Sequence, residues 1–360
     1  MFFKRSIRPV GLLLGVVLLS ACSGGNGSGT LPSKATTDAP ESAFAHANRT
    51  TLREFLYARS RGTSGYHGNV DGWIDPESTA AFKRGVLYVS DIPDFSQLGA
   101  PGTVNIYDGP STNLRARLIG QITGLDSPTG LVVDRKANLY VVQTDFGAPV
   151  LVFAPRAKRP FLRLDTQGLL PGTVCVDSRG NVFVGTTTTM LVYREGHPEP
   201  FARLNGHYGD GISDVIADRE GNIYFDDYFL ETGGEIGAFE ARTTMPTSGP
   251  VQNLGFPVSP LYLAIDGSGD MLLAIFSSTN FIAVFQQGST GSPTEIPVEF
   301  PTAIGFDSAD TSFFSAGNGS VSQYSYPGGA LIKTIRIGTN DSNFGIAVAP
   351  APPLPPSWLP

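Results

Sequence analysis

The chain has 360 residues, a net charge of −7 and only 16% charged residues. Its 43 glycines and 28 prolines exclude a helical bundle or coiled coil, and its 41% hydrophobic content excludes wholesale disorder. The negative net charge also excludes a protein built to follow nucleic-acid phosphates, so no nucleic-acid partner is expected. This composition favours many short strands joined by tight turns.

The first residues carry an export pattern. The apolar run from Val10 to Leu19 is too short for a membrane-spanning helix, and it follows three cations, Lys4, Arg5 and Arg8. The run ends in Leu-Ser-Ala-Cys at residues 19–22, which resembles the lipobox of bacterial lipoproteins. That resemblance implies that residues 1–21 are a signal peptide and that Cys22 is acylated and anchors the chain to lipid.

The same resemblance implies a location on the periplasmic or cell-surface side of a membrane. Ser23 follows the cysteine, which is typical of lipoproteins sent to the outer membrane in a Gram-negative cell. A chain that began at Cys22 would carry a net charge of −10. Residues 22–83 then form a lipid-anchored tether, rich in Gly and Ser at its start.

Two short helices are expected within this tether. The first would begin at a capping box formed by Thr51 and Glu54. The second would begin at Asp75-Pro76-Glu77. Whether residues 48–83 pack against the rest of the protein is left open.

Between the tether and the C-terminus the sequence repeats. Five units share the pattern Asp-x-x-Gly-Asn between two apolar stretches, although the Gly and Asn vary, and these units are centred on Asp134, Asp177, Asp218, Asp266 and Asp307. Each pattern predicts a hairpin in which the Asp accepts backbone N–H bonds and a Gly or Asn adopts positive φ. These five Asp residues are therefore interpreted as structural turn residues.

A third and a fourth strand follow in each unit. The third strand has an aliphatic residue three positions before an aromatic one, as in Val104/Tyr107, Val150/Phe153, Met190/Tyr193, Ile236/Phe239, Ile282/Phe285 and Val321/Tyr324. We expect these aromatic rings to pack between neighbouring sheets. Four short antiparallel strands in about 40 to 45 residues are typical of a propeller blade.

The first unit lacks an opening strand, because Gly85–Asp91 matches the second strand of the other units. The missing strand is at the other end of the chain, where Phe344–Ala349 aligns with Thr129–Asp134. The sequence therefore predicts an all-β fold, a six-bladed β-propeller of four-stranded antiparallel blades over residues 84–350, whose first blade is closed by the C-terminal strand. Residues 351–360 form a Pro-rich tail that cannot join a sheet ladder.

The repeat resembles the NHL-repeat propellers and the wider gluconolactonase-like six-bladed group. This resemblance implies the fold, but it does not imply one activity, because the group includes enzymes, binding modules and scaffolds. Metal-dependent lactonases of the group carry carboxylate and amide ligands just before each innermost strand. Here those positions are mainly neutral or apolar: Thr129, Gly172, Ser213, Leu261, Thr302 and Phe344.

A candidate site lies where first strands begin and second strands end, because these ends share one face of a propeller. The fourth blade supplies most of its polar residues, and the first two blades supply one acid each: His207, Asp210, Asp214, Asp226, Asp227, Tyr228, Asp91 and Asp145. Carboxylates gathered there would hold Ca²⁺ or raise one another's pKa values. The alternative is that these acids only cap turns.

Cysteine and histidine chemistry is not supported. Cys175 lies in a strand-like apolar run and, with Cys22 acylated, has no disulfide partner, so a buried unreactive thiol is expected. None of the four histidines has metal-ligand spacing, so no zinc site is expected.

Two functions fit this sequence. The first is a monomeric cell-envelope lipoprotein whose propeller presents loops to a protein, glycan or small-molecule partner and requires no cofactor. The second is a divalent-metal-dependent hydrolase or lyase of the gluconolactonase-like group, which would use the fourth-blade acids with His207 as a base.

Overall fold

The structure is a computed structural model. It describes residues 69–92, 100–109, 117–205, 212–229, 233–243, 252–253, 260–275, 279–287, 292–317, 319–337 and 345–357. The chain divides into two units, Met1–Glu41 and Ser42–Pro360, and every described residue belongs to the second unit. The signal segment, Cys22 and the capping box at Thr51 and Glu54 lie outside the described residues.

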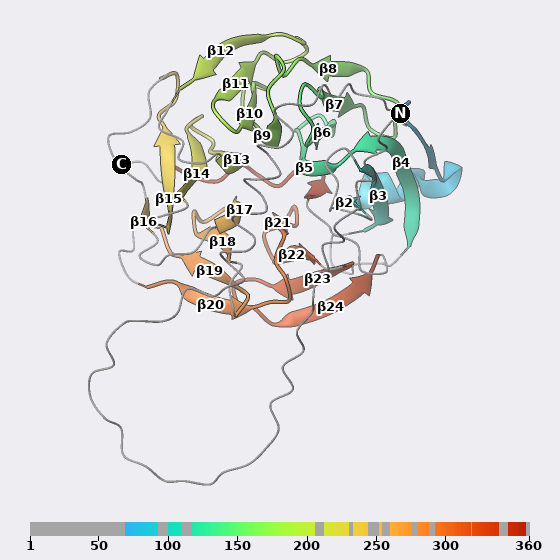
Figure 1. Cartoon of the computed structure of the whole chain (residues 1–360). Coiled ribbons are helices and arrows are strands. Elements are labelled where there is room, and N and C mark those ends of the chain that lie inside the picture. The colour runs from blue at the N-terminus through green and yellow to red at the C-terminus, as the bar shows by residue number, and fades with distance from the viewer. Residues whose placement is uncertain are drawn as a thin grey trace, which may run out of the picture. The chain divides into compact units, whose positions relative to one another are not determined.

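Six antiparallel sheets stand side by side in a ring (Figure 1), which confirms the predicted six-bladed propeller. The second and third blades are formed by β5 (Pro128–Val133), β6 (Leu139–Gln143), β7 (Val150–Phe153) and β8 (Leu162–Leu164), and by β9 (Pro171–Val176), β10 (Val182–Thr186), β11 (Met190–Tyr193) and β12 (Pro200–Leu204). The fourth blade contains β13 (Ile212–Ala217), β14 (Ile223–Phe229), β15 (Gly233–Phe239) and β16 (Gln252–Asn253). The fifth and sixth contain β17 (Pro260–Ile265), β18 (Met271–Ile275), β19 (Phe281–Phe285) and β20 (Thr294–Pro297), and β21 (Ala303–Phe306), β22 (Ser312–Gly317), β23 (Ser320–Ser325) and β24 (Leu331–Arg336).

The first blade closes the ring with the last strand of the chain. Its core strands are β2 (Val86–Asp91), β3 (Pro101–Asp108) and β4 (Leu118–Asp126), and its innermost strand is β25 (Ile346–Ala349). β25 pairs antiparallel with β2 in the register Val86↔Ala349 and Tyr88↔Ala347. The predicted closure by the C-terminal strand is therefore confirmed.

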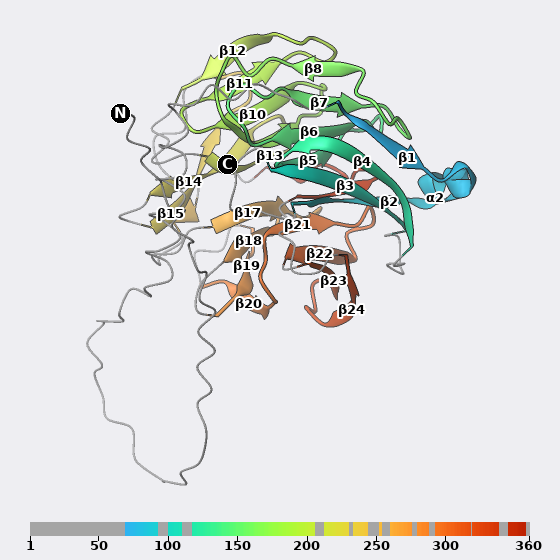
Figure 2. The same cartoon turned by 45° about the vertical axis from the view of Figure 1, so that its right-hand side comes forward.

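Residues before the ring add an element that the sequence left open. β1 (Asp71–Ile74) pairs with the outer edge of β4, so the first blade has five strands rather than four. The 3₁₀ helix η1 (Pro76–Ser78) and the helix α2 (Thr79–Arg84) follow, and Figure 2 shows α2 beyond the end of β1. Asp75 accepts the backbone N–H of Glu77, so the helix predicted at this position is confirmed. Neither described helix is long and apolar enough to cross a membrane.

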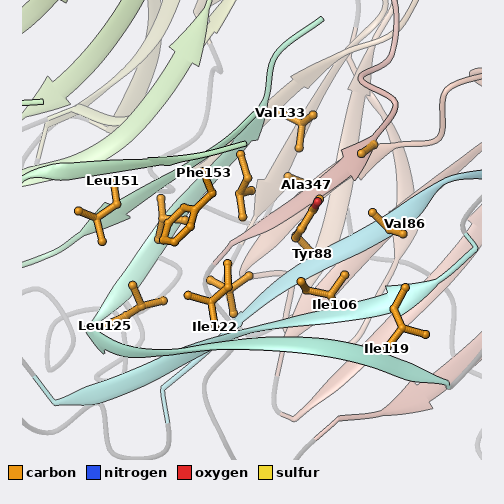
Figure 3. Close-up of a cluster of buried hydrophobic side chains, with 14 of the residues drawn as sticks. Val86, Tyr88, Ile106, Ile119, Ile122, Leu125, Val133, Leu151, Phe153 and Ala347 are labelled. Atoms are coloured by element: carbon orange, nitrogen blue, oxygen red, sulfur yellow. The ribbon is translucent and has the colours of Figure 1, made fainter. Parts of the chain in front are cut away.

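The hydrophobic core is divided into six clusters, one between each pair of neighbouring blades. Figure 3 shows the cluster between the first two blades, where Val86, Tyr88 and Ile106 meet Val133 and Phe153. Alternate residues of one strand enter different clusters: in β6, Leu139 faces the first blade and Tyr140 faces the third. Each blade is therefore apolar on both sides, because successive side chains of a strand point to opposite faces.

The third-strand aromatics confirm their predicted place between blades. Each ring lies in the cluster shared with the preceding blade, and the aliphatic residue three positions earlier lies in the cluster shared with the following blade. The rings are Tyr107, Phe153, Tyr193, Phe239, Phe285 and Tyr324. Positions three apart on a strand face opposite sides, so this spacing serves both interfaces.

The repeated Asp residues form the predicted turns between first and second strands. Asp134 Oδ1 accepts the backbone N–H groups of Lys136 and Asn138, both at 2.8 Å. Its Oδ2 accepts the Asn138 amide at 2.8 Å. The position three after each turn Asp has positive φ in all five units, at Ala137, Gly180, Gly221, Gly269 and Asp310. We call the end of the ring that carries these turns the lower face, and the opposite end, where first strands begin, the upper face.

The positive φ at the position three residues after each turn Asp predicts opposite effects for two substitutions. Ala137→Gly should raise the free energy of unfolding by about 1 kcal/mol, because Ala137 has a φ of 62° that only glycine adopts freely. Gly221→Ala should lower the free energy of unfolding by about 1 kcal/mol, because the φ of Gly221 is 92°. The new Cβ itself has room, since the nearest atom, the Cβ of Ala241, is 3.8 Å away. Urea denaturation measures both.

Ala202→Gly, in the middle of β12, is the matched control. It should destabilise the protein, because glycine weakens an ordinary strand position. A stabilising effect of Ala202→Gly, or none for Ala137→Gly, would contradict the role assigned to positive φ.

Candidate functional site

Six of the eight predicted site residues lie within the described part of the chain, on the upper face of the ring. His207 and Asp210 lie outside the described residues. Asp227 and Tyr228 are described only as backbone positions of β14, opposite Ile212 of β13 and Gly234 of β15 respectively. The side chains of Asp214, Asp226, Asp145 and Asp91 are described.

Asp226 supports the start of the innermost strand of its blade. β13 and β14 pair with a register shift between Ile212 and Val215, so two backbone N–H groups of the bulge lack ladder partners. Asp226 Oδ1 accepts both of them, from Ser213 at 2.9 Å and from Asp214 at 2.8 Å. The carboxylate is fully buried, and these hydrogen bonds satisfy buried donors that would otherwise destabilise the fold.

Asp214 joins three successive blades. Its Oδ1 accepts a hydrogen bond from the hydroxyl of Thr173 in the third blade, at 2.6 Å, and one from the backbone N–H of the next residue, Val215, at 2.9 Å. Its Oδ2 accepts the backbone N–H of Leu263 in the fifth blade at 2.9 Å. The side chain keeps some solvent contact, but desolvation outweighs the hydrogen bonds and raises its pKa to about 6.

Tyr262 completes this group, which we call the axial cluster: Thr173, Asp214, Asp226 and Tyr262. Tyr262 lies on β17, the innermost strand of the fifth blade. Burial raises the pKa of its phenol, and the charges of Asp214 and Asp226 raise it further. The phenol therefore stays protonated beside the two carboxylates and can donate a hydrogen bond to an acceptor.

Thr173 and Tyr262 were not predicted as site residues. They lie four positions before the turn Asp of their units, as Asp214 does, and the whole set at this register is Gly345, Gly130, Thr173, Asp214, Tyr262 and Ala303. The sequence prediction used the register one residue earlier. A comparison of the units at this second register would have drawn attention to Thr173 and Tyr262, because they and Asp214 are its members with polar side chains.

Asp91 and Asp145 lie where the second strands of the first two blades end, as predicted, and both are buried. Asp145 Oδ1 accepts the N–H of Phe146 at 2.8 Å. Burial, together with the Asp91 charge, raises the pKa of Tyr107. Across the described ranges, no three His, Cys, Asp or Glu side chains are grouped closely enough to hold a metal ion. The structure thus brings Asp214 and Asp226 together, and neither Asp91 nor Asp145 joins them in such a group.

The described axial cluster does not by itself match a calcium site. Ca²⁺ takes six to eight oxygen ligands. Here Asp214 and Asp226 supply two carboxylates, and both are engaged with N–H donors of the inner strands. Calcium therefore stays a prediction that depends on carboxylates outside the described part of the chain, namely Asp210 and the side chain of Asp227.

Hydroxyl groups occupy other upper-face positions. Thr129 Oγ1 lies 2.6 Å from the hydroxyl oxygen of Thr144, and it donates to the carbonyl of Gly172 at 3.3 Å. Cys175 is a buried free thiol, as predicted, and burial raises its pKa well above the ordinary value. The described upper face therefore carries hydroxyl groups beside a carboxylate pair that accepts backbone N–H groups.

Comparisons with known proteins support the fold alone. No family model matches the chain, and no curated protein sequence matches it either. Among solved structures, a chain in the crystal structure of a nidogen/laminin complex is similar, with a TM-score of 0.56 and 15% identity. The match covers 74% of this chain and 99% of that one. It is consistent with the propeller architecture, whereas membership of the NHL-repeat or gluconolactonase-like group stays a prediction.

The raised pKa of Asp214 predicts a specific pH dependence of stability. Between an unfolded pKa near 3.8 and a folded pKa of about 6, the folded protein binds more protons than the unfolded chain. The free energy of unfolding should therefore fall as pH rises through this window, by about 2–3 kcal/mol from this group. Asp214→Asn removes that loss, so its stability relative to wild type should increase by this amount between pH 4 and pH 7.

Denaturation at both pH values measures this difference. The cost of placing an amide against the Leu263 N–H is present at both pH values and cancels. Ser213→Ala, on the same strand but without a titrating group, should show the same relative stability at pH 4 and pH 7. A pH-independent effect of Asp214→Asn would mean that Asp214 has an ordinary pKa.

Proposed function

We propose that this protein is a cell-envelope lipoprotein whose propeller is a binding scaffold, with its upper face as the contact surface. The observation that carries this proposal is the use of Asp214 and Asp226, which bind backbone N–H groups of the innermost strands. Carboxylates that accept these N–H groups are fixed in position, and loss of the acceptor oxygens would disturb the inner strands rather than a single chemical step.

Among the groups that the described upper face offers a ligand are hydroxyls, such as those of Thr129 and Thr144, and the phenol of Tyr262. Hydroxyls donate and accept hydrogen bonds without carrying charge, which suits neutral polar partners. A protein segment, a glycan or a small polar molecule has this chemistry. A rigid ring also presents such groups with little loss of conformational entropy on binding.

The anchor in this proposal is Cys22. The basic start, apolar run and Leu-Ser-Ala-Cys ending support lipid attachment, and acylation of both thiol and amine would give more than one chain, as stable anchoring requires. The residues from Cys22 onward would then link the lipid to the blade that begins the ring. In this arrangement the propeller stays close to the membrane and available to partners in the same compartment.

Cys22→Ser should release the protein from membranes. In bacterial cells that make the full chain, wild-type protein should sediment with membranes and incorporate labelled palmitate, while the variant should do neither. Cys175→Ser is the matched control, since its thiol is buried in the ring, and it should behave as wild type. Palmitate incorporation into the Cys22→Ser variant would refute the anchor.

A structural role for the carboxylates predicts how two Asp226 variants and a chelator behave. Asp226→Asn keeps an oxygen for the N–H groups of Ser213 and Asp214, so its melting temperature should stay close to that of wild type. Asp226→Ala leaves two buried N–H groups without an acceptor and should cost about 2–4 kcal/mol. EDTA should leave the melting curve of the wild-type protein unchanged.

The second candidate function predicts the reverse. A resident divalent ion stabilises the folded state by mass action, so its removal lowers the melting temperature. A fall on chelation that Asp226→Asn abolishes, together with metal in the purified protein, would favour the hydrolase or lyase and overturn the scaffold proposal.

A further inference from the structure

The Pro-rich tail does not extend away from the ring. Below β25, where the other units turn back into a second strand, the chain continues as Pro-Ala-Pro-Pro-Leu-Pro-Pro-Ser over residues 350–357. Ala351 still packs against the cluster between the first two blades. The end of the segment contacts the fourth and fifth blades, so the tail crosses from one side of the ring to the other at the lower face.

Groups of the ring donate hydrogen bonds to three carbonyls of the tail. The backbone N–H of Arg219, in the fourth-blade turn, donates to the Pro355 carbonyl at 2.9 Å. In the fifth blade, the Gln287 amide donates to the Ser357 carbonyl at 2.6 Å. The Arg219 guanidinium also reaches the Leu354 carbonyl at 3.5 Å. The ring supplies the donors and the tail supplies the acceptors.

The hydroxyl of Ser357 is recognised as well. Asn222 donates its amide to Ser357 Oγ at 3.0 Å, and the Tyr224 hydroxyl lies 3.4 Å from the same atom. Asn222 and Tyr224 also contact the turn carboxylate of Asp218, so their positions are fixed before the tail arrives. The receiving surface is therefore pre-organised, which reduces the entropic cost of binding a peptide.

Close packing accompanies these hydrogen bonds. Pro355 is buried. A Cβ placed on Gly269, in the fifth-blade turn, would lie 2.9 Å from the Pro356 ring and 2.7 Å from the Gln287 side chain. A glycine at this turn thus lets the proline approach the backbone, and any side chain there would displace it.

This arrangement matches how proteins recognise proline-rich peptides. Proline has no N–H and fixes φ near −65°, so such a segment is stiff and extended, and its carbonyls are free to accept hydrogen bonds. Recognition surfaces for these peptides use donors and aromatic residues of the receptor. Arg219, Asn222 and Gln287 provide the donors on the lower face, opposite the axial cluster, and the hydroxyl of Tyr224, whose ring is buried between the fourth and fifth blades, lies beside Ser357.

We propose that the lower face of the fourth and fifth blades is a binding site for proline-rich peptides of the type Pro-Pro-x-Pro-Pro-Ser, and that the chain's own tail occupies it. Attachment to β25 gives the tail a high effective concentration, so it excludes a free peptide of similar affinity. Another proline-rich segment binds when the tail is displaced or removed. This site is separate from the upper-face function proposed above and does not depend on the lipid anchor.

The test removes the tail from protein that has already folded. A protease recognition sequence inserted between Ala351 and Pro352 is cut after purification, and the released tail is removed by dialysis. A fluorescein-labelled peptide with the sequence of residues 351–357 is then titrated and followed by anisotropy. The cut protein should bind this peptide at least tenfold more tightly than the uncut protein does.

Two variants and two peptides define the site. Gln287→Ala should weaken peptide binding to the cut protein at least fivefold, because the amide that holds the Ser357 carbonyl is lost. Gln167→Ala, an exposed glutamine in the loop before β9, is the matched control and should bind as the cut parent does. A peptide with Ala in place of Ser357 should bind more weakly, and one with Gly in place of the prolines should not bind.

Thermal melting keeps the test decisive if cutting loosens the ring. Peptide that occupies the site must then raise the melting temperature of the cut protein towards that of the uncut protein. The proposal fails if the cut protein neither binds the peptide at millimolar concentration nor gains thermal stability from it. It also fails if the glycine-substituted peptide binds equally well.

Discussion

Packing between blades is the interaction on which this protein depends, because no blade has a core of its own. Every strand that faces two neighbours sends alternate side chains into two clusters, as Leu139 and Tyr140 of β6 do. A blade at the end of an open row would expose one apolar side completely, which costs about 25 cal/mol for each Å² of apolar surface. The ring removes both ends at once, and the cluster between the sixth and first blades, which contains Ile346 and Val348 of β25, is the one that closes it.

Closure of the ring also limits which side chains fit where the innermost strands of neighbouring blades meet. Innermost strands of adjacent blades approach closely: a Cβ on Gly345 would collide with the carbonyl of Thr129, and one on Gly130 would be tightly packed, 3.2 Å from the Thr173 Cα. Asp214 occupies the same register in the fourth blade. It is accommodated because Thr173 and Leu263 donate to it from both sides. A charged group at this depth is costly unless it is hydrogen-bonded, which is why its pKa remains raised despite three donors.

Features encoded within a few residues were predictable from the sequence. The turn Asp binds N–H groups two and four residues ahead, and the third-strand aliphatic and aromatic residues are three apart, so both repeat visibly in each unit. Closure by Phe344–Ala349 was predictable for the same reason, because that segment follows the local pattern of an opening strand. By contrast, the pairing of β1 with β4 joins residues 46 to 52 positions apart, and no repeat marks it. The axial cluster was predicted only in part. Asp214 and Asp226 are recognisable as acids in the sequence, whereas Thr173 and Tyr262 belong to the cluster only because they lie beside acids of the neighbouring fourth blade.

The tail follows from the way the ring is closed. When the last strand of the chain fills the innermost position of the first blade, the turn that would lead to a second strand is replaced by a free continuation, and that continuation must leave at the lower face. The prolines of residues 350–356 prevent it from adding to a sheet edge, but they leave its carbonyls needing donors. The turn residues of the fourth and fifth blades supply them, through the Arg219 N–H and the Gln287 amide. Closure by the C-terminal strand therefore gives the two faces of the ring different roles. The lower face holds a proline-rich segment, and the upper face carries the axial cluster.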